Sequence, residues 1–233
     1  MQKTVFITGA SQGLGLELSR YFSEHGYFVY AGCFSKDAPL FGPGKVMKGD
    51  VSDEKDVRRM FNEIEQLDLL INNARFDPSK RKEGTTDSDW WDMNMQVSLK
   101  GTYLCCVAAL EKMKQQHSGA IINVSSIRAI IPNDLNRIPY GAAKAGQLSL
   151  TRSFAKEAAP YNIRVNTFLP GAIETENLML RITKERHLEV CREIPLQRIG
   201  TMEEMCHAVM FLAENTYMTG AIVNCSGGLL MDM

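Results

Sequence analysis

The sequence predicts an α/β fold, with a doubly wound parallel sheet of about seven strands and helices on both faces. Two observations lead to this expectation. Short apolar runs recur along the chain, and most are separated by segments whose apolar residues repeat at helical spacing. Strand–helix–strand connections of this kind place the strands parallel and cover the sheet. No linker, repeat or low-complexity segment interrupts the alternation, so we expect a single domain over residues 1–233.

Seven apolar runs are expected to form the strands. Each is short and rich in aliphatic residues, as in the DLLIN stretch at 68–72 and the AIINV stretch at 120–124. In chain order the runs are residues 3–8, 27–31, 45–48, 68–72, 120–124, 163–169 and 221–224.

The helices are expected between these runs. Leu14, Leu18 and Phe22 recur at helical spacing after the first run, and Gly26 ends that helix. Further helices are expected at 52–66, 87–115, 140–159 and 202–213. A charged helical insertion at 174–195 is the place where a mobile substrate loop would sit.

Charge and composition exclude several classes of protein. The chain has 26 basic and 27 acidic side chains and a formal net charge of −1, so no nucleic-acid partner is expected. No apolar stretch reaches the roughly 18 residues of a membrane span, and the N-terminal run is too short for a signal peptide. We therefore expect a cytoplasmic protein with no membrane partner. The six cysteines show neither disulfide-framework nor zinc-site spacing, and no metal is expected.

A glycine-rich stretch joins the first expected strand to the first helix. Gly9, Gly13 and Gly15 permit a sharp turn and a close approach of the backbone to a ligand. The helix that follows offers free N–H groups and a positive dipole end, which suit a pyrophosphate. The stretch therefore predicts a dinucleotide-binding loop. Its G-x-x-x-G-x-G spacing differs from the commoner G-x-G-x-x-G, and a glycine turn without a ligand is the alternative.

Tyr140 and Lys144 lie four residues apart at the start of an expected helix, so their side chains share one face. A cation beside a phenol favours the phenolate, and such a pair is suited to acid–base chemistry. The same spacing in isolation is more often that of an ordinary amphipathic helix. Here its meaning depends on the motifs around it.

Several motifs occur together, in order, along nearly the whole chain. They are residues 8–15, 50–51, 72–74, 125–126, 140–144 and 170–175, followed by 195–200, 203–204, 211–213, 219–220 and 227–228. In this combination the sequence resembles the short-chain dehydrogenase/reductase family, and its C-terminal part resembles the bacterial 3-oxoacyl-carrier-protein reductase branch. The resemblance implies a Rossmann-type sheet and NAD(P)-dependent hydride transfer between a carbonyl and a secondary alcohol.

The resemblance also implies roles for the catalytic candidates. Tyr140 would give or take a proton at the substrate oxygen, because hydride transfer to a carbonyl leaves an alkoxide. Ser126 would hydrogen-bond the same oxygen, with Ser125 as the alternative member of the pair. Lys144 would hold the nicotinamide ribose and favour the ionised form of the phenol.

Cofactor contacts are implied at the carboxyl ends of the strands, where such sheets bind ligands. Asp50 and Val51 would meet the adenine, Asn73 and Ala74 would line the cleft, and Thr175 would bond the nicotinamide carboxamide. The full expected set is Gly9, Ser11, Gln12, Gly13, Leu14, Gly15, Phe34, Asp50, Val51, Asn73, Ala74, Tyr140, Lys144, Pro170, Gly171, Ile173 and Thr175.

Three positions depart from the family's pattern. The fourth catalytic residue, an Asn that holds a proton-relaying water, is Ser98 here, and Asn94 one turn earlier is an alternative. Arg75 replaces a glycine, where it would either obstruct the cofactor or contact a phosphate or an anionic substrate. Ser226 replaces a mainly structural Asp. Ser98, Arg75 and the absence of the acidic cofactor residue at the end of the second strand leave a second hypothesis beside an active enzyme, that of a catalytically weak dinucleotide-binding sensor or partner subunit.

The end of the second strand bears on the choice between NADP and NAD. NAD is read there by an acidic residue on the ribose 2′-hydroxyl, and NADP by a cation with room for a phosphate. Cys33 stands at the acidic position, while Ser35 and Lys36 could take a phosphate despite the nearby Asp37 and an uncharged Gln12. The sequence favours NADP and leaves NAD open. The stretch 36–44 is short, so a helix between the second and third strands is expected to be missing.

The expected substrate is a small-molecule carbonyl or alcohol, with 3-oxoacyl thioesters, small ketones and polyols all open. The resemblance implies a homodimer or homotetramer that pairs the helices at 87–115 and 140–159. Tyr103, Cys106 and Leu110 could face either the core or the partner.

Overall fold

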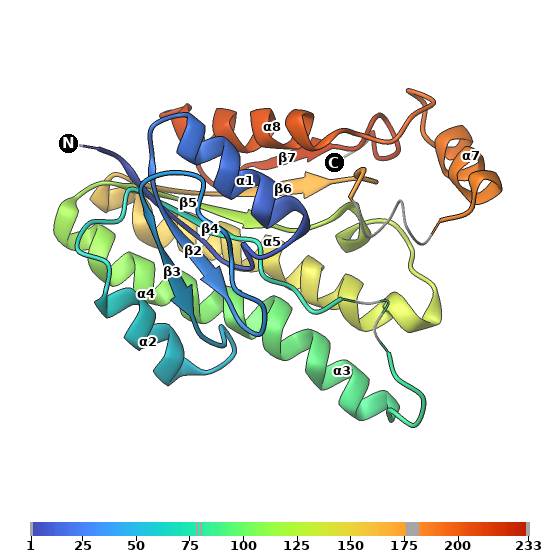
Figure 1. The fold of residues 1–233 in the computed structure, drawn as a ribbon, viewed down its shortest axis with the longest axis horizontal. Helices are drawn as coiled ribbons and strands as arrows, with labels where there is room; N and C mark the ends of the chain where they lie inside the picture. The colour runs from blue at the N-terminus through green and yellow to red at the C-terminus, as the bar shows by residue number, and fades with distance from the viewer. Residues whose placement is uncertain (1, 78, 80, 176–181, 232–233) are drawn as a thin grey trace.

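A computed structural model describes residues 2–77, 79, 81–175 and 182–231. Its centre is a seven-stranded sheet in the order β3-β2-β1-β4-β5-β6-β7, and every neighbouring pair of strands is parallel (Figure 1). The predicted α/β fold class is confirmed. The strands are β1 Thr4–Ile7, β2 Phe28–Cys33, β3 Gly44–Lys48, β4 Leu69–Asn72, β5 Gly119–Val124, β6 Ile163–Pro170 and β7 Ile222–Cys225.

Helices cover both faces of the sheet. The α-helices are α1 Gly13–Glu24, α2 Glu54–Asn62, α3 Asp87–Met95, α4 Gly101–Gln116, α5 Ile138–Ala158, α7 Lys184–Glu193 and α8 Met202–Glu214. A π-helical turn, η1 Gln96–Lys100, joins α3 to α4, and three short 3₁₀ turns are η2 Ile127–Ala129, η3 Leu135–Arg137 and η4 Ala159–Tyr161. Figure 1 shows α1 and α8 side by side on one face of the sheet.

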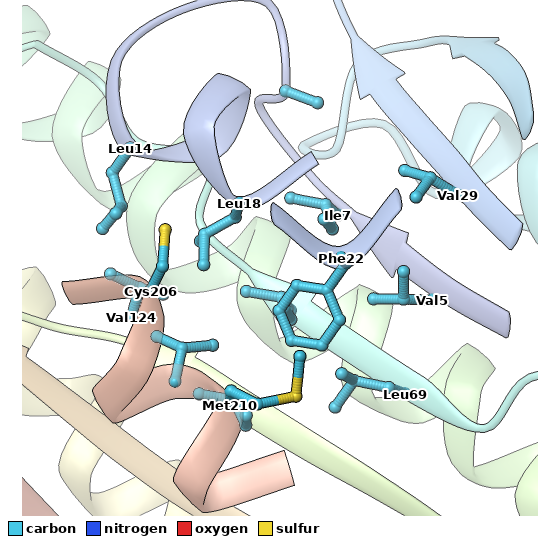
Figure 2. Packing of buried hydrophobic residues seen from close by; sticks show 14 of the residues in the cluster. Val5, Ile7, Leu14, Leu18, Phe22, Val29, Leu69, Val124, Cys206 and Met210 are labelled. Atoms are coloured by element: carbon cyan, nitrogen blue, oxygen red, sulfur yellow. The ribbon is translucent and has the colours of Figure 1, made fainter. Parts of the chain in front are cut away.

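Two apolar clusters separate the layers, and alternate strand residues enter one or the other. Val5 and Ile7 of β1 join the cluster beneath α1 and α8, whereas Phe6 between them joins the cluster of α2, α4 and α5. Figure 2 shows Phe22 of α1 and Met210 of α8 packed with side chains from the strands. This packing sets α1, and therefore the loop before it, at the carboxyl end of β1.

The boundaries of several elements differ from the prediction. The helix expected at 87–115 is three consecutive segments, because the π-helical turn η1 interrupts it. The helix expected to reach residue 66 ends at Asn62, and buried Ile64 and Leu67 lead the chain into β4. The helix α5 begins at Ile138 with Pro139 in its first turn, where proline is well tolerated.

The connection from β2 to β3 contains no helix over residues 34–43, as predicted. The insertion expected at 174–195 contains α7, while its residues 176–181 lie outside the described part of the chain. Within that part, none of the helices combines the length and apolar character that crossing a membrane requires.

The packing beneath α1 predicts the consequence of removing its central aromatic ring. Phe22 is fully buried, so Phe22→Ala is expected to lower the free energy of unfolding by about 3–5 kcal/mol through lost burial and a residual cavity. Urea denaturation measures this change. The control Tyr217→Ala, at a fully exposed side chain, should stay within about 0.5 kcal/mol of the original protein. Equal losses in the two variants would contradict the packing described.

Candidate active site

The glycine loop after β1 has the geometry of a phosphate cradle. Gly9 and Gly13 have φ of 68° and 55°, in the left-handed region that favours glycine. A Cβ on Gly15 would collide with the Gly9 carbonyl oxygen and the Asn73 side-chain amide. Gln12 precedes α1 without a side-chain cap, so N–H groups of the first turn remain for a ligand. These features fit a dinucleotide pyrophosphate.

The end of β4 holds this loop in place. Asn73 donates its side-chain amide to the carbonyl oxygens of Thr8 at 3.0 Å and Gly9 at 3.1 Å. In return, the Thr8 hydroxyl accepts the backbone N–H groups of Asn73 and Ala74, both at 3.0 Å. Asn73 is one of the residues expected to line the cofactor cleft, and its side-chain amide also shapes the loop. Leu14, another expected contact, has its side chain in the apolar core, so only its backbone is left for a ligand.

The end of β3 places the expected adenine contacts in a tight turn. The Asp50 carboxylate accepts the Ser52 backbone N–H at 2.8 Å and its hydroxyl at 2.7 Å. Val51 packs against Gly101, where an added Cβ would come within 2.8 Å of the valine side chain.

The end of β2 lacks an acidic group that faces the ribose. Cys33 is buried, and Phe34 beyond it is exposed. The exposed carboxylate of Asp37 pairs with Lys48 on β3 at 3.3 Å, which partly offsets its negative charge. Sequence reasoning did not foresee this pair, because it depends on how the connection after β2 folds back beside the end of β3.

Tyr140 and Lys144 come together on the first turns of α5, as their spacing predicts. Both are buried, and the Lys144 Nζ lies 5.8 Å from the centre of the Tyr140 ring. Lys144 is only 1% exposed and donates to the Val124 carbonyl oxygen at the end of β5 at 2.6 Å. It also donates to Gln147 Oε1 at 3.2 Å. Gln147 did not appear among the sequence candidates, although a polar amide on the buried face of α5 is an available signal.

The two serines after β5 have different partners. The Ser125 hydroxyl is buried and donates to the Lys144 backbone carbonyl at 2.9 Å, which fixes α5 against the strand. Ser126 precedes η2, and its hydroxyl oxygen accepts the Arg128 N–H at 3.2 Å. That bond leaves the Ser126 hydroxyl hydrogen for a ligand. The difference favours Ser126 over Ser125 as the candidate catalytic serine.

Ser98 is fully buried in η1. Its hydroxyl oxygen accepts the Phe76 N–H at 3.1 Å, which ties the loop after β4 to this helix. Asn94 is also buried, and its amide nitrogen donates to the Trp90 carbonyl within α3 at 2.8 Å. In the described part of the chain, neither side chain hydrogen-bonds to Lys144. Ser98 reaches the site through its backbone carbonyl oxygen, which accepts from Gln147 at 2.7 Å.

The ends of β6 and β7 bring further expected residues together. Gly171 donates its N–H to Cys225 at 2.9 Å, and an added Cβ would meet the Ser226 backbone at 2.8 Å. Ile173 bridges to Gly200, and the Thr175 N–H donates to the Ile173 carbonyl at 2.8 Å. The Ser226 hydroxyl accepts the Leu230 N–H at 3.2 Å, in keeping with a structural role.

Burial is the main influence on the charge of Lys144. It lowers the pKa of the ammonium to about 7, and repulsion from Arg75 acts in the same direction. The Arg75 side chain is about half exposed and lies 3.6 Å from the Asp77 carboxylate. A buried amine with a depressed pKa beside a phenol is typical of catalytic sites.

A parallel sheet with a dinucleotide cradle and a buried Tyr–Lys pair defines a nucleotide-dependent oxidoreductase. The chain belongs to the short-chain dehydrogenase/reductase family. Residues 9–230 match a family model described as enoyl-(acyl carrier protein) reductase.

Named relatives cover nearly the whole chain. An uncharacterized oxidoreductase of Thermotoga maritima is 35% identical over 97% of this chain and 96% of its own. The 3-oxoacyl-[acyl-carrier-protein] reductase FabG of the same organism is 34% identical over 98% of each. Among solved structures, ElxO with NADP bound has a TM-score of 0.86 at 28% identity and covers 98% of this chain and 99% of its own. A gluconate 5-dehydrogenase from Burkholderia cenocepacia, in complex with NADP and tartrate, has a TM-score of 0.85 at 26% identity, covering 97% and 94%.

The depressed pKa of Lys144 predicts how stability depends on pH. In the unfolded chain the amine keeps its ordinary pKa of 10.5, whereas in the folded chain it titrates near 7. Between these values folding releases a proton, so this group's contribution to the free energy of unfolding rises with pH. The stability of Lys144→Met relative to the original protein should therefore be greatest below pH 7 and decline above it, by at most about 1.4 kcal/mol per pH unit.

Urea unfolding at a series of pH values measures the difference. The companion variant Arg75→Met removes the repelling charge and should weaken the pH dependence of a protein that keeps Lys144. A difference between Lys144→Met and the original protein that stays constant from neutral to alkaline pH would contradict the buried-ammonium assignment.

Proposed function

We propose that this chain interconverts a carbonyl and a secondary alcohol with NADP(H), and that Tyr140 is the proton donor and acceptor. When bound, the nicotinamide supplies or takes up the hydride. The observation that carries the proposal is the buried pair on α5, with the Lys144 Nζ 5.8 Å from the Tyr140 ring. In the reducing direction, Tyr140 gives its proton to the substrate oxygen, and the Lys144 ammonium stabilises the phenolate that remains. Ser126 donates its hydroxyl hydrogen to the same oxygen.

The proposed cofactor contacts follow the ends of β1 to β6. The glycine loop takes the pyrophosphate, Asp50 and Val51 border the adenine, and Lys144 bonds the ribose of the nicotinamide. NADP is favoured over NAD because residues 33–36, at the end of β2, include no carboxylate that could bind a ribose 2′-hydroxyl. The nearby carboxylate of Asp37 is paired with Lys48. The solved structures of ElxO and of the gluconate 5-dehydrogenase likewise hold NADP.

The proposed substrate is a small molecule, and a 3-oxoacyl thioester heads the candidates because several relatives are named 3-oxoacyl-[acyl-carrier-protein] reductases. A single domain over residues 1–233, a mobile substrate loop at 174–195 and a cytoplasmic location stay predictions from the sequence. The second candidate is a dinucleotide-binding sensor. It is favoured by one observation, the engagement of the Ser98 hydroxyl with Phe76 instead of the catalytic pair.

Turnover and cofactor binding separate the two candidates. The purified protein, mixed with NADPH and a panel of 3-oxoacyl thioesters, small ketones and keto-sugars, should oxidise NADPH with at least one of them. Tyr140→Phe is expected to lower kcat by at least about 100-fold, because the proton donor is lost. NADPH affinity, measured by fluorescence titration, should change only a few-fold. Full turnover in Tyr140→Phe would contradict the mechanism, and binding without turnover in the original protein would favour the sensor.

We also propose that the chain forms a homodimer, or a homotetramer built from such dimers, through the face of η1, α4 and α5. An apolar groove of about 460 Å³ lies there, lined in part by Met95, Leu99, Tyr103 and Leu150. Tyr103 is 46% exposed and is available to a partner, whereas Cys106 and Leu110 are buried in the core. The occupant proposed is the same face of a second copy, as the family resemblance implies.

Light scattering after size-exclusion chromatography tests the interface. Tyr103→Glu places a charge in the groove and should convert a dimer to a monomer, or a tetramer to dimers held by its other interface. The matched variant Tyr217→Glu, at a fully exposed tyrosine, should leave the mass unchanged. An oligomer of unchanged mass in Tyr103→Glu would exclude this face.

A further inference from the structure

Gln147 contacts the proposed catalytic lysine but has no role in the reaction proposed above. It follows Lys144 by three residues on α5 and is fully buried. Both ends of its side-chain amide are engaged. The Oε1 accepts from Lys144 Nζ at 3.2 Å, and the Nε2 donates to the Ser98 carbonyl oxygen and to the Thr102 hydroxyl, both at 2.7 Å.

The contacts on the nitrogen side determine which way the amide points. The Ser98 carbonyl can only accept a hydrogen bond, so it requires the NH₂ group of Gln147. A flipped amide would set its oxygen against that carbonyl and its NH₂ group against an ammonium. The Thr102 hydroxyl donates to the same Ser98 carbonyl at 3.0 Å, which leaves its oxygen to accept from Gln147. The Gln147 oxygen is therefore directed at Lys144.

Among the residues that the structure describes, this oxygen is one of two acceptors that hold the Lys144 ammonium. The other is the Val124 carbonyl at the end of β5, so two of the three N–H groups are engaged. In the described part of the chain, two further groups act on the ammonium: the Tyr140 ring on α5 and the charge of Arg75 after β4, which repels it. The oxygen of Gln147 thus opposes both the burial and the repulsion that disfavour the charged form.

We propose that Gln147 is a positioning residue that keeps Lys144 charged and aimed at Tyr140, by means of an amide oriented from the backbone of Ser98. The proposal rests on the proposed role of Lys144 in catalysis. It gives residue 98 an indirect role, because its carbonyl orients Gln147 while its hydroxyl bonds Phe76. The side chain of Gln147 thus connects the π-helical turn η1 to Lys144.

The test compares two substitutions of similar size. Gln147→Met has no acceptor, so Lys144 should lose its proton at lower pH and the alkaline limb of the kcat profile should move down by about one pH unit. Gln147→Glu supplies a carboxylate to the ammonium and should move the same limb upward. Opposite displacements are the signature of an acceptor, because a purely structural defect would not change sign between the two variants.

Thr151→Val is the matched control. Thr151 lies one turn further along α5 and is fully buried, and its hydroxyl oxygen accepts from Asn123 at 2.9 Å and from Thr167 at 2.7 Å. The hydroxyl donates to the backbone carbonyl of Gln147 at 2.9 Å, so it contacts the helix backbone and not the Gln147 amide. Its substitution should lower Tm about as much as Gln147→Met does, with the pH profile unchanged. The proposal would be overturned if the alkaline limb of the kcat profile fell at the same pH in Gln147→Met, Gln147→Glu and the original protein. Gln147 would then be a packing residue only.

A second readout needs neither substrate nor cofactor. The dependence of the free energy of unfolding on pH reports the Lys144 titration in the protein alone. In Gln147→Met the free energy of unfolding should begin to rise at a lower pH than in the original protein. In Gln147→Glu it should begin to rise at a higher pH. If the original protein reduced no carbonyl but the two variants shifted this curve in opposite directions, the proposed function would fail and the positioning role would stand. Identical curves would refute the positioning role by themselves.

Discussion

The site depends on one constraint, the burial of the Lys144 ammonium within the fold. A buried charge is strongly disfavoured unless protein groups replace the water it has lost. Here the replacements are the Val124 carbonyl, at the last residue of β5, and the oxygen of Gln147. Both depend on elements distant in the chain, since β5 must end beside the first turns of α5 and η1 must orient Gln147. The depressed pKa near 7 is the physical result of incomplete compensation.

The cofactor half of the site depends on a second set of polar contacts between strand ends. The residues after β4 clamp the loop after β1, through Asn73 and Thr8, so the cradle is shaped before any ligand arrives. The parallel sheet makes this possible, because it brings the carboxyl ends of β1, β4, β5 and β6 to one edge. Apolar side chains between the sheet and the helices α1 and α8 pack together and fix these strands relative to the two helices (Figure 2).

Local patterns in the sequence predicted much of this arrangement. The seven strands, the glycine loop and the shared face of Tyr140 and Lys144 follow from periodicity and spacing within short segments. The contacts that sequence reasoning missed depend on how the chain folds back on itself, over 11 residues for Asp37 and Lys48 and over 49 residues for Gln147 and Ser98. The π-helical turn was missed for another reason. It spans only residues 96–100, and five residues are too few for an apolar pattern to distinguish it from the α-helices on either side. The resemblance to a family identified residue 98 as unusual, but only the structure relates its backbone to Lys144.

Direct titration of the Lys144 side chain tests the central claim. NMR spectra of the protein with ¹³C-labelled lysine, assigned by comparison with Lys144→Met, would follow one amine from acidic to alkaline pH. If the ammonium is desolvated and repelled by Arg75, the midpoint should lie near 7, well below the 10.5 of a free lysine. A midpoint at the ordinary value would contradict the central claim, because the ammonium would then be neither desolvated nor repelled by Arg75.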